Sequence, residues 1–154
     1  MRDVTLCYFL TEDKILLAMK KRGFGEGLWN GYGGKVEEGE TIREAACREI
    51  KEESDLDTKE EDLEEVGVID FFFKDREDWN QRVHIFFIRV WEGIEKETEE
   101  MNPKWFDIDS MPTENLWKDD RYWLPEALSG KKIEAKFLFT KDGKDIKEMN
   151  IKYS

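Results

Sequence analysis

The sequence has little of what disulfide-bonded, zinc-binding or membrane-spanning proteins require. Its 154 residues include two cysteines, one histidine and three prolines. Cys7 and Cys47 form no CxxC pair, so we expect no disulfide framework and a reducing, cytoplasmic location. With His84 as the single histidine, a structural zinc site is excluded, and we expect an ordinary sheet histidine. The apolar runs are short and interrupted by charge, which predicts neither a signal peptide nor a membrane span.

Positive charge is also scarce. The chain has 25 lysines and arginines against 37 aspartates and glutamates, which gives a net charge of −12. An acidic surface repels the backbone of DNA or RNA, so a nucleic-acid polymer is not an expected partner. A small polyphosphate is compatible with this charge if metal ions lie between it and the protein. Six Trp, four Tyr and ten Phe residues argue against disorder and predict one folded domain over residues 1–154, expected to be a monomer.

Strand and helix patterns alternate along the chain. Apolar and aromatic runs predict strands at residues 4–10, 15–19, 66–73, 83–91, 104–108, 133–139 and 145–152. Residues 11–14 and 141–144 are typical of hairpin turns. Helices are predicted at residues 42–53 and from Asp119 or Asp120, one of which is expected to cap the helix, to residues 129–130. This order predicts an α/β (α+β) fold with a mixed sheet between helices.

Two carboxylates occupy the apolar face of the first predicted helix. At about 100° per residue, a sector about 60° wide holds Ile42, Ala46, Glu49 and Glu53. A buried, unpaired carboxylate costs several kcal/mol, so a bound cation is the simplest reason for this arrangement. The alternative is that residues 48–53 form a solvated helix face, which is usual in so acidic a chain.

The residues before this helix favour the cation. Thr41-x-x-Glu44 is a capping box, which starts the helix at residue 42 and fixes its phase. Three glycines, Gly31, Gly33 and Gly34, come just before it, where a backbone can approach a ligand closely. Neither the spacing of a dinucleotide-binding loop nor that of a P-loop is present, so both of these nucleotide-binding motifs are rejected.

The spacing of residues 34–56 resembles the signature of the Nudix hydrolase family, G-x5-E-x7-R-E-U-x-E-E-x-G-U, in which U is aliphatic. The positions are filled by Gly34, Glu40, Arg48, Glu49, Ile50, Glu52, Glu53 and Leu56. Asp55 departs from the pattern, because the family has glycine there. That glycine is expected to serve a left-handed helix end, which aspartate tolerates better than most residues. We therefore expect some lost stability and no lost chemistry.

Other segments resemble the oxidised purine nucleoside triphosphatases of the MutT-homologue type within this family. They are KKRGFG at residues 20–25, WNG at 29–31, EMNP with WF at 100–106, and WKDDRYW at 117–123. The resemblance runs through nearly the whole chain and implies the Nudix fold. The Nudix signature implies diphosphate chemistry, whereas these further segments carry the inference about the substrate.

For the chemistry, the resemblance implies Mg²⁺, with Mn²⁺ as a substitute, and carboxylate oxygens suit both ions. The implied ligands are the carbonyl of Gly34 and the carboxylates of Glu49, Glu52, Glu53 and Glu100. The general base is assigned to Glu49 or Glu53, with Glu100 as the third candidate. Glu40 and Arg48 are implied to orient these carboxylates. Lys35 either contacts phosphate or is merely solvated.

For the substrate, the resemblance implies a small nucleotide read by residues from several segments. Asn30, Asp119 and Asp120 would read the base, Phe24, Phe71, Phe73, Met101 and Trp117 would form apolar walls, and Thr5 and Lys20 would lie near the sugar. Gln81 stands where the animal members carry an apolar residue. Two adjacent carboxylates in a pocket repel each other as anions, which raises one pKa so that a proton is kept. Moving that proton would admit both 8-oxoguanine and 2-oxoadenine.

The expected function is Mg²⁺-dependent hydrolysis of 8-oxo-dGTP and 2-oxo-dATP to the monophosphate and pyrophosphate, which would sanitise the nucleotide pool. Water would attack Pα or Pβ. One alternative is a Nudix hydrolase of another substrate, such as a methylated purine triphosphate, an ADP-sugar or a dinucleoside polyphosphate. The other is a nucleotide-sensing domain without catalysis. Such domains typically lose the carboxylates of the signature, all of which are present here.

Overall fold

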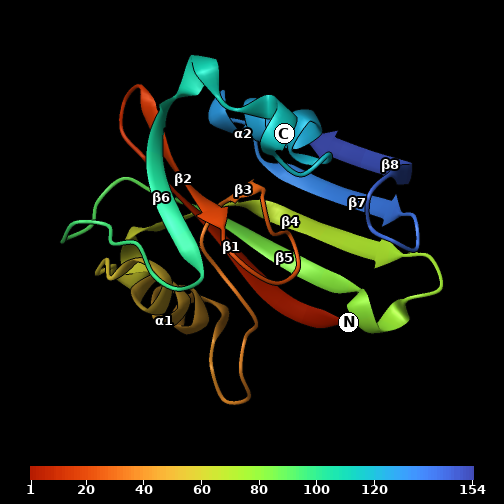
Figure 1. Cartoon of the computed structure of the whole chain (residues 1–154), viewed down its shortest axis with the longest axis horizontal. Helices are drawn as coiled ribbons and strands as arrows, with labels where there is room; N and C mark the ends of the chain where they lie inside the picture. The colour runs from red at the N-terminus through yellow and green to blue at the C-terminus, as the bar shows by residue number, and fades with distance from the viewer.

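The computed structural model describes residues 1–154 and contains one mixed sheet of eight strands with two α-helices (Figure 1). The strands are β1 Arg2–Leu10, β2 Lys14–Lys20, β3 Trp29–Asn30, β4 Leu63–Phe73, β5 Gln81–Ile88, β6 Met101–Asp107, β7 Ile133–Phe139 and β8 Ile146–Tyr153. The helices are α1 Ile42–Ser54 and α2 Asp120–Leu128. Neither has the length and apolar character needed to cross a membrane.

The strand order is β3-β2-β1-β5-β4-β7-β8, and β6 pairs with β2 outside this path. β1 runs parallel to β5, and β4 runs parallel to β7, whereas the other pairs are antiparallel. The N-terminal strand therefore lies beside residues 81–88, far along the chain. This pairing makes β1, β5 and β4 the middle of the sheet.

The two helices cover opposite faces of the sheet. Alternate residues of a strand point to opposite faces, and in β1 both faces are buried. Tyr8 packs into one core cluster with Trp123 of α2, at a ring-centroid distance of 6.0 Å. Phe9 packs into the second cluster with Ile50 of α1. The predicted mixed sheet between helices is confirmed.

Helix α1 begins and ends as the sequence predicts. The Glu44 N–H donates to Thr41 Oγ1 at 3.1 Å, and the Thr41 N–H donates to Glu44 Oε1 at 2.9 Å, so the capping box is formed. After the last helical residue, Asp55 adopts the left-handed conformation with φ 66°. Its carboxylate pairs with Lys51 at 3.1 Å and with Lys96 at 2.9 Å. Aspartate therefore occupies the glycine position of the signature with two ionic partners that glycine would lack.

The predicted cap of α2 is wrong. Asp119 precedes the helix, but its backbone is already helical, with φ −70° and ψ −29°, and no side-chain hydrogen bond caps the first turn. Asp119 Oδ2 instead accepts a hydrogen bond from Trp123 Nε1 at 3.0 Å. The buried carboxylate is thus bonded to a side chain one turn further along the same helix.

Three strands differ from the prediction by three residues at one end, and one strand was not predicted. β4 begins three residues earlier, β5 ends three residues earlier and β6 begins at Met101 rather than at residue 104. Pro103 is tolerated in β6 because this strand pairs only with β2. The strand that the sequence did not predict is β3, which has only two residues, too few to show an alternating pattern.

Candidate functional site

The candidate site lies where β1 and β2 separate. These strands are directly paired at only two positions, next to their turn. Further along β1, the segment 31–35 takes the place of β2, with bridges between Cys7 and Tyr32 and between Val4 and Lys35. This segment leads toward helix α1, and it contains Gly31, Gly33 and Gly34, the last of which belongs to the signature.

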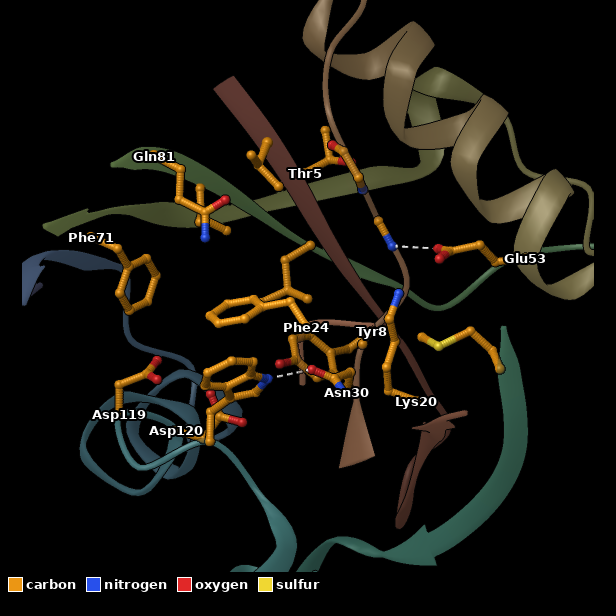
Figure 2. A pocket seen from close by; sticks show the side chains of 18 of the residues that line it. Thr5, Tyr8, Lys20, Phe24, Asn30, Glu53, Phe71, Gln81, Asp119 and Asp120 are labelled. Carbon is orange, nitrogen blue, oxygen red and sulfur yellow. Dashed lines mark hydrogen bonds between the residues drawn. The ribbon is translucent and has the colours of Figure 1, made fainter. Parts of the chain in front are cut away.

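An apolar pocket lies on the face of the sheet that α2 covers (Figure 2). Its lining includes all ten residues that the resemblance assigned to the substrate: Thr5, Lys20, Phe24, Asn30, Phe71, Phe73, Met101, Trp117, Asp119 and Asp120. They come from β1, β2, β3, β4, β6, two loops and the start of α2. The complete fold is needed to bring them together.

Asp119 and Asp120 form the acidic end of this pocket, and both are buried. Burial raises the pKa of Asp119 to about 6. Burial, and after it the charge of Asp119, raises the pKa of Asp120 well above its ordinary value. Both shifts favour retention of a proton by the pair, which would let one carboxyl group donate a hydrogen bond while the other accepts.

Asn30 is held in one orientation by its neighbours. Trp117 Nε1 donates to Asn30 Oδ1 at 2.6 Å, and Asn30 Nδ2 donates to the carbonyl of Leu28 at 2.8 Å. An indole N–H can only donate, so the amide oxygen must face it. The second N–H of the amide remains available for a ligand.

Aromatic rings line the mouth of the pocket. The ring of Phe24, which is 53% exposed, lies 5.0 Å from Trp117 and 5.3 Å from Trp79 between centroids. Gly25 has φ +88°, and a Cβ there would lie 2.8 Å from Trp117 Cζ2. Only glycine lets this loop rest against the indole. The rings offer apolar faces on which a planar base can stack.

A second cavity adjoins the first and has no hydrophobic lining. Its residues are Arg22, Glu49, Glu52, Glu53, Thr98, Glu99 and Glu100. All four carboxylates that the resemblance assigned to metal are among them. Glu53 lines both cavities, so this one side chain joins the apolar pocket to the acidic cavity.

Glu53 is buried without a cationic partner within salt-bridge distance. Its one hydrogen bond is accepted by Oε1 from the N–H of Gly33 at 2.9 Å. Burial, the largest cause, and the nearby charges of Glu49 and Glu100 raise the pKa of Glu53 to about 8. A buried carboxylate that lacks a counter-charge is stabilised by a cation.

Arg48 holds three carboxylates around one guanidinium group. It donates to both oxygens of Glu40, at 2.7 and 2.9 Å, and Nη1 donates to Glu49 at 2.9 Å and to Glu52 at 3.3 Å. The hydrogen bond from Arg48 lowers the pKa of Glu40 to about 2. Glu40 and Arg48 line neither cavity, and Arg48 meets the acidic cavity through its contacts with Glu49 and Glu52.

Gly34 is in direct contact with one of these carboxylates. A Cβ at Gly34 would lie 2.6 Å from Glu49 Cδ, so any side chain there would displace the carboxylate. The carbonyl of Gly34 accepts a hydrogen bond from the N–H of Thr5 at 2.9 Å. β1 therefore fixes the position of the carbonyl that the resemblance assigned to metal.

The acidic side chains share the cavity without converging on one point. No group of three or more His, Cys, Asp or Glu side chains is arranged to hold a metal ion. Glu49 and Glu52 turn to Arg48, and Glu100 lies 3.9 Å from Lys20 and 3.7 Å from Arg22. The donor set still fits a hard divalent cation, because it consists of carboxylate oxygens and one oxygen of Glu53 accepts no hydrogen bond.

The structure adds residues that the sequence did not single out. Tyr8, Val83 and Phe139 line the apolar pocket, and Arg22 lines the acidic cavity. The first three follow the strand alternation, which could have placed them on this face once the face was known. Arg22 follows β2 in a loop, where no periodic pattern exists. Lys35, a candidate for phosphate contact, lines neither cavity.

Comparison with known proteins identifies the family. Residues 1–127 match the NUDIX domain. The chain is 47% identical over 138 residues to the oxidized purine nucleoside triphosphate hydrolase of Mus musculus, covering 90% of this chain and 86% of the mouse protein. The protein of the same name from Danio rerio is 45% identical over 136 residues, covering 88% and 85%. The solved structure of the mutator MutT protein from Bacillus halodurans is similar with a TM-score of 0.83 at 25% identity, covering 98% of this chain and 97% of that chain.

The chain therefore belongs to the Nudix family, as its fold and its signature predicted. It is a Nudix hydrolase, an enzyme, and it is related to the mouse and zebrafish proteins over most of its length. Hydrolases of this family generally use divalent metal ions.

Proposed function

We propose that this enzyme hydrolyses oxidised purine nucleoside triphosphates, such as 8-oxo-dGTP and 2-oxo-dATP, to the monophosphate and pyrophosphate with Mg²⁺ or Mn²⁺. The observation that carries the proposal is that Glu53 lines both the apolar pocket and the acidic cavity. A nucleotide with its base in the pocket would extend its phosphates toward the carboxylates. The names of the mouse and zebrafish relatives support an oxidised purine as the base. Such an enzyme would clear damaged precursors from the cytoplasmic nucleotide pool.

Divalent ions would be held by Glu49, Glu52, Glu53 and Glu100 with the carbonyl of Gly34. Bound ions would neutralise the charge that develops on the phosphates. Glu53 or Glu49, with Glu100 as the third candidate, accepts the proton of the water that attacks Pα or Pβ. Arg48, fixed by Glu40, holds Glu49 in place for this step.

The base would be read by groups whose orientation the protein already fixes. Asn30 offers its free N–H, and the proton kept by Asp119 and Asp120 lets the pair present two donor–acceptor patterns. Moving the proton between the two carboxyl groups suits either 8-oxoguanine or 2-oxoadenine. The exposed ring of Phe24 and the indole of Trp117 would stack on the base, while Thr5 and Lys20 would lie near the sugar.

The test is Mg²⁺-dependent turnover of 8-oxo-dGTP, 2-oxo-dATP, O6-methyl-dGTP and unmodified dGTP, with pyrophosphate and phosphate measured separately. We expect pyrophosphate, and kcat/KM values highest for the two oxidised purines. Turnover without preference would retain the phosphate chemistry and refute the proposed substrate. Nucleotide binding without any turnover would refute the proposal in favour of a sensing domain.

A further inference from the structure

One polar side chain in the apolar pocket lies on a strand face whose other residues are apolar. Along β5, residues 81, 83, 85 and 87 share the face that α2 covers, and the last three are the buried Val83, Ile85 and Phe87. The first is Gln81, the only glutamine of the chain. Gln81 is partly buried and lines the pocket, and Figure 2 shows its amide directed into the pocket.

The amide of Gln81 has no partner within the protein, in contrast to the other amides nearby. The adjacent Asn80 accepts a hydrogen bond from the N–H of Phe73 at 2.9 Å and so stabilises the hairpin between β4 and β5. Asn30, the other amide in the pocket, is bonded at both its oxygen and its nitrogen. Gln81 makes neither kind of contact. Both its donor and its acceptor are free for a ligand.

The position of Gln81 restricts which part of a bound purine it can meet. Its backbone pairs with Phe71 of β4 and Arg2 of β1, so it belongs to the wall that the sheet provides. Asp119 and Asp120 lie at the start of α2, and Glu53 comes from α1 at the junction with the acidic cavity. If the aspartates read the pairing edge of the base and the sugar points toward Glu53, the imidazole edge is left for the sheet wall.

The chemistry of that edge changes on oxidation in a way that matches a carboxamide. An unmodified purine has an acceptor at N7 and only a C–H at C8. An 8-oxopurine has an N–H at N7 beside a carbonyl at C8, so a donor and an acceptor are adjacent. A glutamine amide presents the complementary pair, with Nε2–H donating to the C8 carbonyl and Oε1 accepting from N7–H.

We infer that Gln81 is a specificity-determining residue that pairs through its amide with the N7–H and C8=O edge of an 8-oxopurine. This inference rests on the proposed function. It adds a second group that recognises the base, on the part of the pocket formed by the sheet and not by α2. Recognition by Asp119 and Asp120 is indifferent to C8, whereas recognition by Gln81 depends on it. The selectivity for 8-oxo-dGTP and for 2-oxo-dATP therefore has separate structural causes.

The test uses 2-oxo-dATP as an internal reference, because its N7 and C8 are unmodified. Gln81→Met keeps the length of the side chain and removes the amide, and Gln81→Glu keeps one acceptor and removes the donor. We expect each variant to lower the ratio of kcat/KM for 8-oxo-dGTP to that for 2-oxo-dATP by about tenfold. The control is Asn150→Met, which makes the same change from amide to thioether at an exposed position of β8, and it should leave the ratio unchanged.

A binding measurement without metal separates this inference from the proposed function. The affinity of the wild type for 8-oxo-dGMP should exceed that for dGMP, and Gln81→Met should reduce the difference by a similar factor. Failure of the wild type to hydrolyse either triphosphate would refute the proposed function. The monophosphate affinities would still test whether Gln81 recognises the 8-oxopurine. An unchanged ratio in both variants, or a larger loss with 2-oxo-dATP, would overturn the assignment of Gln81.

Discussion

The apolar pocket and the acidic cavity meet at Glu53, but their polar groups are held by different kinds of partner. In the pocket, Asp119 and Asn30 are fixed by the indole N–H groups of two tryptophans. In the cavity, Glu49 and Glu52 are held by the guanidinium group of Arg48. Glu100 pairs with the half-buried Lys20 and the exposed Arg22. Neutral hydrogen-bond donors in packed surroundings hold their acceptors rigidly, whereas ion pairs near solvent can exchange partners. The proposed base end is thus preorganised by packing, and the proposed phosphate end depends on counter-charge.

The largest effect should arise at the residue the two regions share. Glu53→Gln should lower kcat by about 10²–10⁴-fold, because it removes the candidate base and a metal ligand. The melting temperature should not fall, since the substitution replaces a buried carboxylate of raised pKa by a neutral group. Steady-state kinetics at saturating Mg²⁺ and thermal unfolding measure both quantities. Glu134→Gln, on the exposed side of β7, is the control. A fully active Glu53→Gln variant would show that the cavity is not the metal site.

A smaller effect, confined to the acidic cavity, is expected from Arg48→Ala. Without the guanidinium group, Glu49 and Glu52 lose their common partner, and the concentration of Mg²⁺ at half-maximal activity should rise about 10–100-fold. The ratio of activities on 8-oxo-dGTP and dGTP should stay constant, because no residue that reads the base is touched. Arg48→Lys should recover only part of the loss, since an ammonium group cannot bond to both oxygens of Glu40 as a planar fork does. A change in base preference with an unchanged Mg²⁺ requirement would reverse the assignment of the two regions.

Asp119→Asn tests the opposite region. We expect the preference for 2-oxo-dATP over dATP to fall by about tenfold, because these bases differ at the pairing edge and the pair loses its exchangeable proton. The Mg²⁺ requirement should stay as in the wild type. Competition between 2-oxo-dATP and dATP in one reaction measures the preference directly. An equal loss on all nucleotides would count against a role of Asp119 in reading the base.

The same pair predicts how stability depends on pH. The pKa of Asp119 is raised from 3.8 to about 6 in the folded protein, so the folded state binds more protons than the unfolded state between these values. The free energy of unfolding should therefore fall as the pH rises from about 4 to about 6, and the raised pKa of Asp120 acts in the same direction. Asp119→Asn removes the contribution of Asp119 alone, so its stability should fall less steeply with pH, and it should be more stable than the wild type at pH 7.5 by about 1–2 kcal/mol. Urea unfolding of both proteins at pH 5 and 7.5 gives the comparison, and parallel pH profiles would contradict the prediction.

The smallest effect is expected at the end of α1. Asp55→Gly would relieve the left-handed backbone but would remove the exposed ion pairs with Lys51 and Lys96. Strain of about 1 kcal/mol and surface pairs of about 0–1 kcal/mol each are of similar size, so the net change should be within about 0.5 kcal/mol. Chemical denaturation measures it. A large gain in stability would show that the two lysines contribute nothing.

The two regions also differ in how far the sequence predicts them. The capping box and the apolar stripe predicted α1 and the inward direction of Glu49 and Glu53, because both are local patterns. The lining of the pocket followed from the resemblance to the family, and the structure places all ten residues there. Local patterns failed where burial decides which partner a side chain takes. Asp119 has the sequence position of a helix cap, but its buried carboxylate accepts a hydrogen bond from the indole of Trp123 instead.

The acidic cavity shows the same limit more strongly. The positions of Arg22 and Glu100 depend on charge pairing between the loop after β2 and the segment before β6, which no periodicity records. The hydrogen bonds from Arg48 to Glu40, Glu49 and Glu52 likewise depend on the folded structure and follow from no local pattern. β3 was missed because two residues pair by proximity to β2 and not by pattern.

The place of Glu53 between the two cavities has a thermodynamic consequence. A carboxylate that borders both sites makes the occupancy of one depend on the occupancy of the other. By reciprocity, whatever factor the divalent ion contributes to nucleotide affinity, the nucleotide must contribute to ion affinity. An empty enzyme would then hold its ions weakly and bind them fully only together with the nucleotide, which makes the substrate a part of its own catalytic centre.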